Sequence, residues 1–144
     1  MQTEDNKATK PPIILDTNIL ISAIIFPGDV TRQILLQGFR EYRVVFSDET
    51  WDEFAVVMQR QEFERRLPLR ERLLALEGIA LRSEVISVPA GVTDCRDAKD
   101  NKFLDLALST QASCIVTGDK DLLDLHPWRG VNILTPSEFI ANEK

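Results

Sequence analysis

The feature that most constrains the fold is a short apolar run, Ile13–Leu15, that ends abruptly at Asp16. Short apolar runs bounded by turn signals are typical of strands buried on both faces of a parallel sheet. Asp16, Thr17 and Asn18 are turn and helix-capping residue types, so a helix is expected to begin here. Ligands of open α/β sheets bind at the carboxyl ends of the strands. The sequence therefore predicts that the Asp16 carboxylate lies at that edge.

The rest of the chain alternates between strand and helix patterns, which predicts one α/β domain with a mostly parallel sheet. Residues 1–11 are polar and are expected to form a flexible tail, with the domain at 12–144. Gly38 is expected to end the second helix. Strands are expected at 13–15, 42–46, 83–88, 114–117 and 131–134, and helices at 19–26, 31–38, 48–60, within the Leu-rich segment 61–82, at 97–112, at 121–125 and from 135.

The composition indicates a single globular domain, because 144 residues with 44% hydrophobic content can form one core. No apolar run approaches the roughly 18 residues of a membrane span, and the polar N-terminus does not resemble a signal peptide, so a cytoplasmic location is expected. One histidine and two cysteines without CxxC spacing argue against a zinc site or a disulfide framework. The net charge of −6 excludes a nucleic-acid binder that relies on a basic surface alone.

A second apolar strand pattern ends in the same way as the first. Cys114 to Thr117 is followed by Gly118 and then Asp119. In a parallel sheet, both carboxylates would emerge at the same edge. Each aspartate alone is equally well explained as the cap of the helix that follows it. Because the pattern occurs twice, a shared site is favoured.

A third acid, Asp100, lies on the apolar stripe of the helix expected at 97–112. An acidic residue on a buried face is costly unless something satisfies it. Asp105 falls on the outer side and is expected to be solvated. Asp97 is explained first as a helix cap and second as a site residue. The apolar residues that follow Asp100 at helical spacing are Phe103, Leu104, Ala107 and Leu108.

The fourth candidate comes from the helix expected at 48–60. Glu53 borders the buried face of this helix, whereas the acids of the first turn are explained by the helix dipole. Spacing favours Glu53 without excluding Asp52.

Carboxylates gathered at one edge repel one another. A pair about 4 Å apart costs on the order of 4 kcal/mol at an effective dielectric of ~20. Such groups stay ionised together only around a cation, unless one of them holds a proton. A set of oxygen ligands without His or Cys suits Mg²⁺ or Mn²⁺. A bound ion of this kind activates water and stabilises a phosphodiester in transit, which is the chemistry of a metal-dependent nuclease.

Four stretches together resemble the PIN domain, in particular its bacterial branch of toxins from toxin–antitoxin systems. They follow one another at the expected spacing, and the ending at 133–139 fits the same branch. The polar tail before Pro11 is a departure from the family pattern. The resemblance implies a three-layer fold with about five strands in a flavodoxin-like layout, flanked by helices. The four stretches are Ile14–Asn18, Ser47–Glu53, Arg96–Leu104 and Val116–Leu123.

The resemblance also implies an endoribonuclease that depends on Mg²⁺ or Mn²⁺ and leaves a 5′-phosphate. The family's acidic quartet matches Asp16, Glu53, Asp100 and Asp119, which settles Glu53 over Asp52. Three aspartates would hold one metal directly or through water, while Glu53 would orient or deprotonate the attacking water or help to hold a second metal.

Other positions match supporting parts of the family site. Thr17 and Asn18 match polar residues that shape the first site, and Asp121 matches a position that assists through water. Asp97 is kept as a supporting residue. A basic rim must then receive the RNA, and Lys99 and Lys120 are nearest in sequence to the quartet. The other basic candidates, each also explained as a solvated surface charge, are Arg32, Arg40, Arg43 and Lys102.

The toxin branch implies RNA as the substrate, an antitoxin protein as a partner, and a homodimer. The Leu-rich segment 61–82 offers a surface for the homodimer, and core packing explains this segment equally well. Two other function classes are open. A Mg²⁺-dependent aspartyl phosphotransfer or phosphatase domain is one, but the phosphatase would require Asp-x-Asp, and here Asn18 stands at the second position. A catalytically silent binding module is the other class, and the intact quartet argues against it.

Overall fold

The computed structural model describes residues 10–26, 28 and 30–142 of the chain. Strands and helices alternate along it, as the sequence predicts. In chain order the elements are β1 (Pro12–Leu15), α2 (Thr17–Ile25), α3 (Val30–Glu41), β2 (Arg43–Ser47), α4 (Asp48–Met58), η1 (Gln61–Phe63), α5 (Leu69–Arg82), β3 (Glu84–Ile86), η2 (Ala98–Asp100), α6 (Asn101–Thr110), β4 (Cys114–Val116), α7 (Lys120–Leu123), β5 (Asn132–Leu134) and α8 (Pro136–Asn142), where η marks a 3-10 helix.

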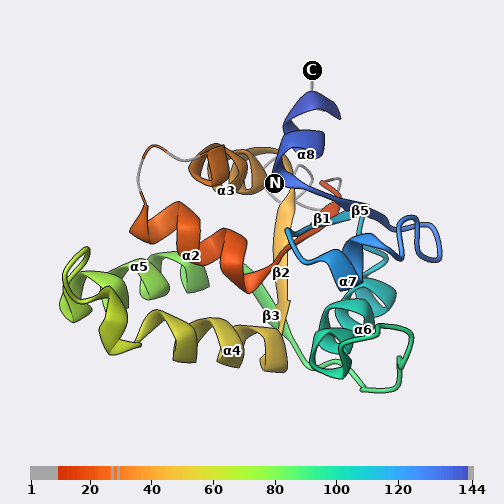
Figure 1. Ribbon diagram of the computed structural model, residues 1–144, viewed down its shortest axis with the longest axis horizontal. Coiled ribbons are helices and arrows are strands. Elements are labelled where there is room, and N and C mark those ends of the chain that lie inside the picture. The colour runs from red at the N-terminus through yellow and green to blue at the C-terminus, as the bar shows by residue number, and fades with distance from the viewer. Residues whose placement is uncertain (1–9, 27, 29, 143–144) are drawn as a thin grey trace, which may run out of the picture.

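The strands form a five-stranded sheet in the order β3-β2-β1-β4-β5, and all neighbouring strands are parallel. This confirms the predicted fold class. β1 is central, with Ile13 paired to Val44 of β2 on one side and to Cys114 of β4 on the other. The chain runs outward from β1 through β2 to β3 (Figure 1). It then returns to β4, so the strand order reverses between β1 and β4. Such a reversal creates the crevice in which open α/β sheets bind ligands.

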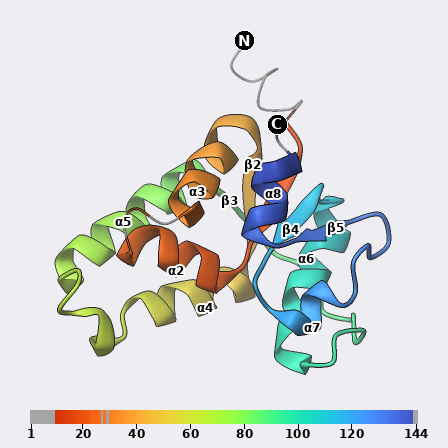
Figure 2. The ribbon, with the colours of Figure 1, turned by 45° about the horizontal axis from the view of Figure 1, so that its top comes forward.

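Helices cover both faces of the sheet and produce three layers (Figure 2). Successive side chains of a strand point to opposite faces. Ile13 and Leu15 therefore pack into a core shared with α2, α3, α4, α5 and α8. Ile14 and Ile115 pack on the other face, against α6 and α7. The two cores hold β1 and β4 rigidly, so the residues that follow these strands have fixed positions.

Gly38 lies inside α3 and does not end it, which corrects the sequence-based expectation. The helix continues to Glu41. A Cβ atom at Gly38 would lie 3.4 Å from Val44 Cγ2 and 3.8 Å from Ile13 Cγ2. These are ordinary van der Waals distances, so Gly38 is a buried position of α3 that faces β1 and β2 and has room for a methyl group.

Two segments expected to be helical are divided into shorter elements. The Leu-rich segment 61–82 contains η1 and α5, and Pro68 stands at the N-cap of α5. The segment 97–112 begins with η2, which Asp97 caps by accepting a hydrogen bond of 3.3 Å from the Lys99 amide. Asp100 therefore sits at the junction between η2 and α6, where its side chain is held at a helix start.

The predicted tail at 1–11 lies outside the described residues except for Lys10 and Pro11, whose carbonyl groups accept hydrogen bonds from Arg43. Within residues 10–26, 28 and 30–142, no single helix is long and apolar enough to cross a membrane; α2 and α3 meet that test only as a pair bent by 109°.

The buried guanidinium of Arg72, in α5, forms hydrogen bonds to the segment that connects α4 to α5. Arg72 is 1% exposed. It donates hydrogen bonds to the carbonyl oxygens of Met58 at 2.7 Å, Arg60 at 3.1 Å and Leu67 at 2.7 Å, and it pairs with Glu64 at 2.7 Å. Because α4 carries one of the candidate acids, this connection contributes to the geometry of the site.

Arg72→Met is expected to lower the free energy of unfolding by about 3 kcal/mol, because the buried carbonyl groups lose their donors. Urea unfolding followed by circular dichroism measures the change. The control is Arg70→Met on the exposed side of the same helix, with an expected change within about 0.5 kcal/mol. Equal losses in the two variants would contradict the role given to Arg72.

Candidate functional site

Asp16 directly follows β1 and is buried at the carboxyl edge of the sheet. It is 7% exposed, and its Oδ2 accepts a hydrogen bond of 2.5 Å from Thr117 Oγ1. Burial raises the pKa of Asp16, Thr117 opposes this shift, and the carboxylates of Glu53 and Asp119 add to it. The backbone amide of Asn18 also lowers the pKa of Asp16, but the Asp16 side chain makes no capping hydrogen bond at the start of α2. Helix capping therefore does not explain why an acid is buried here.

Thr117 connects the ends of β1 and β4. It is fully buried, and its hydroxyl donates to Asp16 Oδ2 while accepting a hydrogen bond of 3.0 Å from the Asp119 amide. Asp119 in turn caps α7, because its Oδ1 accepts a hydrogen bond of 2.9 Å from the Asp121 amide. Asp16 and Asp119 thus lie next to each other at the reversal of strand order.

Asp100 approaches this edge from the layer of α6. It is 6% exposed, and its Oδ2 is buried without a hydrogen-bond partner. Burial is the main reason that the pKa of Asp100 is raised to about 7, followed by a side-chain hydrogen bond with Asp119 and by the charges of Asp119, Asp97 and Asp16. A buried carboxylate oxygen without a donor is costly. This oxygen is therefore the clearest sign that the edge takes up a proton or a cation.

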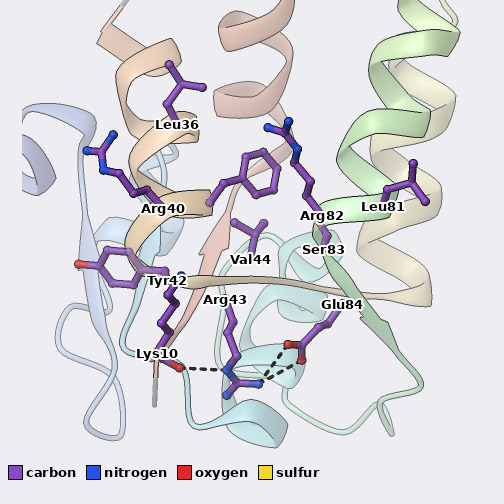
Figure 3. Close-up of a pocket in the computed structure, with 11 residues that line it drawn as sticks. Lys10, Leu36, Arg40, Tyr42, Arg43, Val44, Leu81, Arg82, Ser83 and Glu84 are labelled. Atoms are coloured by element: carbon purple, nitrogen blue, oxygen red, sulfur yellow. Dashed lines mark hydrogen bonds and ion pairs between the residues drawn. The ribbon is translucent and has the colours of Figure 1, made fainter. Parts of the chain in front are cut away.

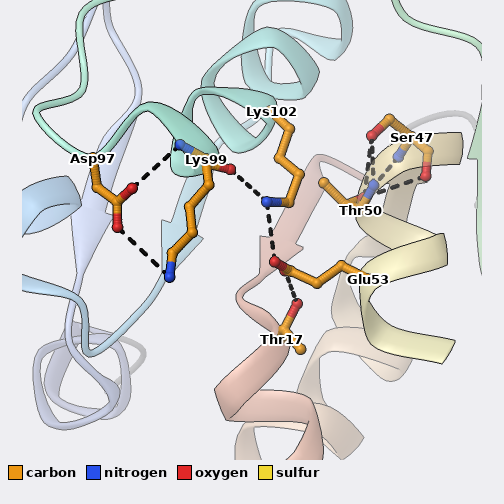
Figure 4. A network of polar contacts seen from close by, with 7 residues as sticks. All are labelled: Thr17, Ser47, Thr50, Glu53, Asp97, Lys99 and Lys102. Atoms are coloured by element: carbon orange, nitrogen blue, oxygen red, sulfur yellow. Dashed lines mark hydrogen bonds and ion pairs between the residues drawn. The ribbon is translucent and has the colours of Figure 1, made fainter. Parts of the chain in front are cut away.

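Glu53 reaches the site from α4, and both of its carboxylate oxygens have partners (Figure 4). Oε1 accepts a hydrogen bond of 2.5 Å from Thr17 Oγ1. Oε2 lies 3.0 Å from Lys102 Nζ, in an ion pair whose side chains are 29% and 13% exposed. The neighbouring Asp52 is exposed. Glu53 is thus the acid of α4 that faces the other site residues.

The four carboxylates influence one another electrostatically but do not form a ready-made metal cluster. In the described part of the chain, no three His, Cys, Asp or Glu side chains are arranged to hold an ion. Protein donors hold three of the four carboxylates instead: Thr117 bonds Asp16, the Asp121 amide bonds Asp119, and Thr17 and Lys102 bond Glu53. The donor set still fits a hard divalent cation, since it consists of carboxylate oxygens and Asp100 Oδ2 has no other partner.

The other predicted supporting residues have local roles. Asn18 is exposed at the start of α2. Asp97 caps η2 and keeps a partly exposed carboxylate, which contributes to the raised pKa of Asp100. Asp121 contributes its amide to the Asp119 cap.

Asp105 is buried, which corrects the expectation that it faces solvent. It is 9% exposed, and its Oδ1 accepts a hydrogen bond of 2.9 Å from the Val92 amide. In the same way, Asn101 Oδ1 accepts from the Cys95 amide at 2.8 Å. The loop between β3 and η2 covers this side of α6, and helical spacing cannot reveal such a covering loop.

Lys99 and Lys120 are exposed beside the acids, as residues that contact a substrate would be. Their side chains are 73% and 82% exposed. Each makes one surface ion pair, Lys99 with Asp97 at 3.8 Å and Lys120 with Asp124 at 3.1 Å. Exposed pairs of this kind contribute little to stability and are easily exchanged for another anion.

Arg40 and Arg43 lie at the amino end of the sheet, because Arg40 is in the last turn of α3 and Arg43 begins β2. The acids lie at the carboxyl end, so these two arginines are too far away to belong to the candidate RNA rim. Arg43 begins β2 and pairs at 3.1 Å with Glu84 at the start of β3. Together with Lys10 they line a cavity of about 650 Å³ (Figure 3). Arg32 lines another cavity, between α2, α3 and α5, and donates to a carbonyl oxygen of α2.

Sequence reasoning missed two residues of this edge. The sequence pattern assigns Thr117 to a strand and gives it no further role, although its place before Gly118 and Asp119 puts it at the same strand end as the acid. Its charge makes Lys102 a candidate for RNA contact, whereas the structure pairs it with Glu53. Its position directly after Asp100 and Asn101 was the available signal.

Three comparisons place the chain among known proteins. Residues 12–121 match the family model described as a PIN domain. An uncharacterized protein of Methanocaldococcus jannaschii is 31% identical over 147 residues, covering 95% of this chain and 94% of that protein. The structure is also similar to a chain in the crystal structure of VapBC2 from Rickettsia felis bound to a DNA fragment from their promoter. The TM-score is 0.60, and the two chains are 15% identical over an alignment that covers 86% of this chain and 98% of the other.

The raised pKa of Asp100 gives the metal-free protein a characteristic pH dependence. Folded Asp100 holds its proton to about pH 7, whereas the unfolded carboxyl loses it near pH 4, so stability falls as the pH rises between these values. We expect Asp100→Asn to be more stable than wild type at pH 8, by on the order of 2 kcal/mol, and about equally stable at pH 4. Urea titrations in EDTA at both values measure this.

The matched control is Asp52→Asn, which removes an exposed carboxylate from α4. It is expected to leave the pH dependence of wild type in place. If the Asp100→Asn curve ran parallel to that of wild type, the burial of Asp100 would not have the electrostatic consequence described.

Proposed function

This chain belongs to the PIN domain family, and we propose that it is an endoribonuclease that depends on Mg²⁺ or Mn²⁺. PIN domains are generally nucleases, and those nucleases generally use divalent ions. The observation that carries the proposal is the unpartnered Oδ2 of Asp100, buried beside Asp16 and Asp119 at the reversal of strand order. Neither helix capping nor packing accounts for an oxygen in that position.

In this proposal Asp16, Asp100 and Asp119 hold the ion. When bound, the ion supplies a water of lowered pKa and stabilises the charge on the phosphate. The chain's own residues hold the carboxylates in position. Thr117 fixes Asp16 relative to the Asp119 backbone, so these two carboxylates are held at the ends of rigid strands.

Glu53 orients the attacking water or accepts its proton. Its carboxylate is fixed by Thr17 on one side and Lys102 on the other, and this suits a group that must act in one orientation. The exposed ammonium groups of Lys99 and Lys120 receive the RNA backbone. Supporting roles remain for Asn18, Asp97 and Asp121 at the rim.

We further propose that the protein acts in the cytoplasm as the toxin of a toxin–antitoxin pair. The similarity to a structure from a VapBC2 complex supports a protein partner. The surface at α3 and α5 suits such a partner, because Leu36 and Leu81 are 52% and 82% exposed there and Arg82 lies between them. The contacting segment of the partner is expected to be apolar and acidic. A homodimer through the same exposed leucines is the competing use of this surface.

Replacing Asp16 tests the proposed activity. Purified wild type is expected to cleave single-stranded RNA with Mn²⁺ or Mg²⁺, to leave 5′-phosphate ends, and to be inactive in EDTA. Asp16→Asn keeps the size of the side chain but removes the negative charge with which Asp16 binds the ion. Cleavage is therefore expected to fall by on the order of 10²–10³-fold. Gel assays of a labelled oligonucleotide measure the rate.

Asp52→Asn serves as the control, since it removes an acid from the exposed side of α4, and its rate is expected to stay within about twofold of wild type. Cleavage that persists in Asp16→Asn or in EDTA would overturn the assignment. A wild-type protein that binds its partner but cuts no RNA would favour a silent binding module.

A further inference from the structure

We propose that the ammonium group of Lys102 takes the place of a second divalent ion at this site. Each chain would then bind one divalent ion. The inference rests on the proposed function, because it concerns the ion-binding half of the same site. Beyond that function, the four acids fall into two groups: Glu53 is paired with Lys102, and the three aspartates face the ion. Lys102 is a positioning residue in this account and does not touch the substrate.

The first support is the position of Lys102. Its side chain is only 13% exposed, whereas those of Lys99 and Lys120 are 73% and 82% exposed. A lysine is rarely buried unless it is paired. Its Nζ lies 3.0 Å from Glu53 Oε2 and also donates a hydrogen bond to the Lys99 carbonyl oxygen (Figure 4). The ammonium group is therefore held between α4 and η2 and is not a mobile surface charge.

The second support is the state of the Glu53 carboxylate. One oxygen accepts from Thr17 and the other pairs with Lys102, so a metal ion at Glu53 would compete with two donors that are already in place. Asp100 presents the opposite case, because its Oδ2 has no partner. The carboxylate oxygen without a partner thus belongs to Asp100, beside Asp16 and Asp119, and not to Glu53.

Charge balance leads to the same division. Lys102 neutralises one of the four carboxylates, and one divalent ion then offsets two of the remaining three negative charges. A second divalent ion beside Lys102 would place two cations next to each other at short range, which is unfavourable in a partly buried site. Removing the Lys102 charge removes that obstacle and leaves Glu53 as an unpaired acid next to the aspartates.

The test counts Mn²⁺ ions bound by the full chain, using isothermal titration and the electron paramagnetic resonance signal of free Mn²⁺. Wild type is expected to bind one ion. Lys102→Met is expected to bind two, the second more weakly, and Lys102→Arg is expected to return to one because it restores the positive charge. Lys99→Met, which removes an exposed ammonium group three residues away, is the matched control and is expected to bind one.

Glu53→Gln provides a second route that does not depend on the folding of the lysine variants. Because Glu53 is paired with Lys102 and not with the ion, this variant is expected to bind one Mn²⁺ with affinity within roughly tenfold of wild type. Loss of all binding in Glu53→Gln would identify Glu53 as a direct ligand and would overturn the inference.

Two ions in wild type, or one ion in a folded Lys102→Met, would also overturn it while leaving the proposed ribonuclease intact. One ion in wild type without any RNA cleavage would instead refute the proposed function and leave the division of the site standing. Absence of Mn²⁺ binding to wild type would contradict both.

Discussion

Asp16 and Asp100 are acids buried at the carboxyl edge of a parallel sheet, where water cannot solvate their charges. Burial raises the pKa of both groups, and it leaves one oxygen of Asp100 without a partner. Such an arrangement opposes folding whenever the groups are ionised. The two apolar cores on either face of the sheet compensate for it, and they also keep the strand ends rigid. The stability of the framework is thus what permits a strained acidic edge.

Protein donors then divide the edge into two parts. Thr117 joins Asp16 to the backbone of Asp119 across the reversal of strand order, and this hydroxyl does so without adding charge. Lys102 and Thr17 instead satisfy Glu53. Asp100 Oδ2 therefore stays without a partner, while both carboxylate oxygens of Glu53 have one. We propose that this difference gives four acids of similar chemistry two different tasks.

Much of this fold was predictable from local patterns, because short apolar runs and helical spacing depend on neighbouring residues only. The parallel strands, the buried face of α6 and the acids at both strand ends follow from such patterns. The surroundings of Gly38, Asp105 and Lys102 do not follow from such patterns, because each of these residues contacts a distant segment. Gly38 meets β1 and β2, Asp105 meets the loop before η2, and Lys102 meets α4. Spacing along one helix carries no information about these contacts.

Anomalous scattering from a crystal grown with Mn²⁺ can show whether Asp16, Asp100 and Asp119 share one divalent ion while Glu53 stays paired with Lys102. We expect one anomalous peak, in contact with Asp16, Asp100 and Asp119 directly or through water, and an intact ion pair between Lys102 and Glu53. Two peaks at the edge, or one peak coordinated by Glu53 with Lys102 displaced, would contradict it.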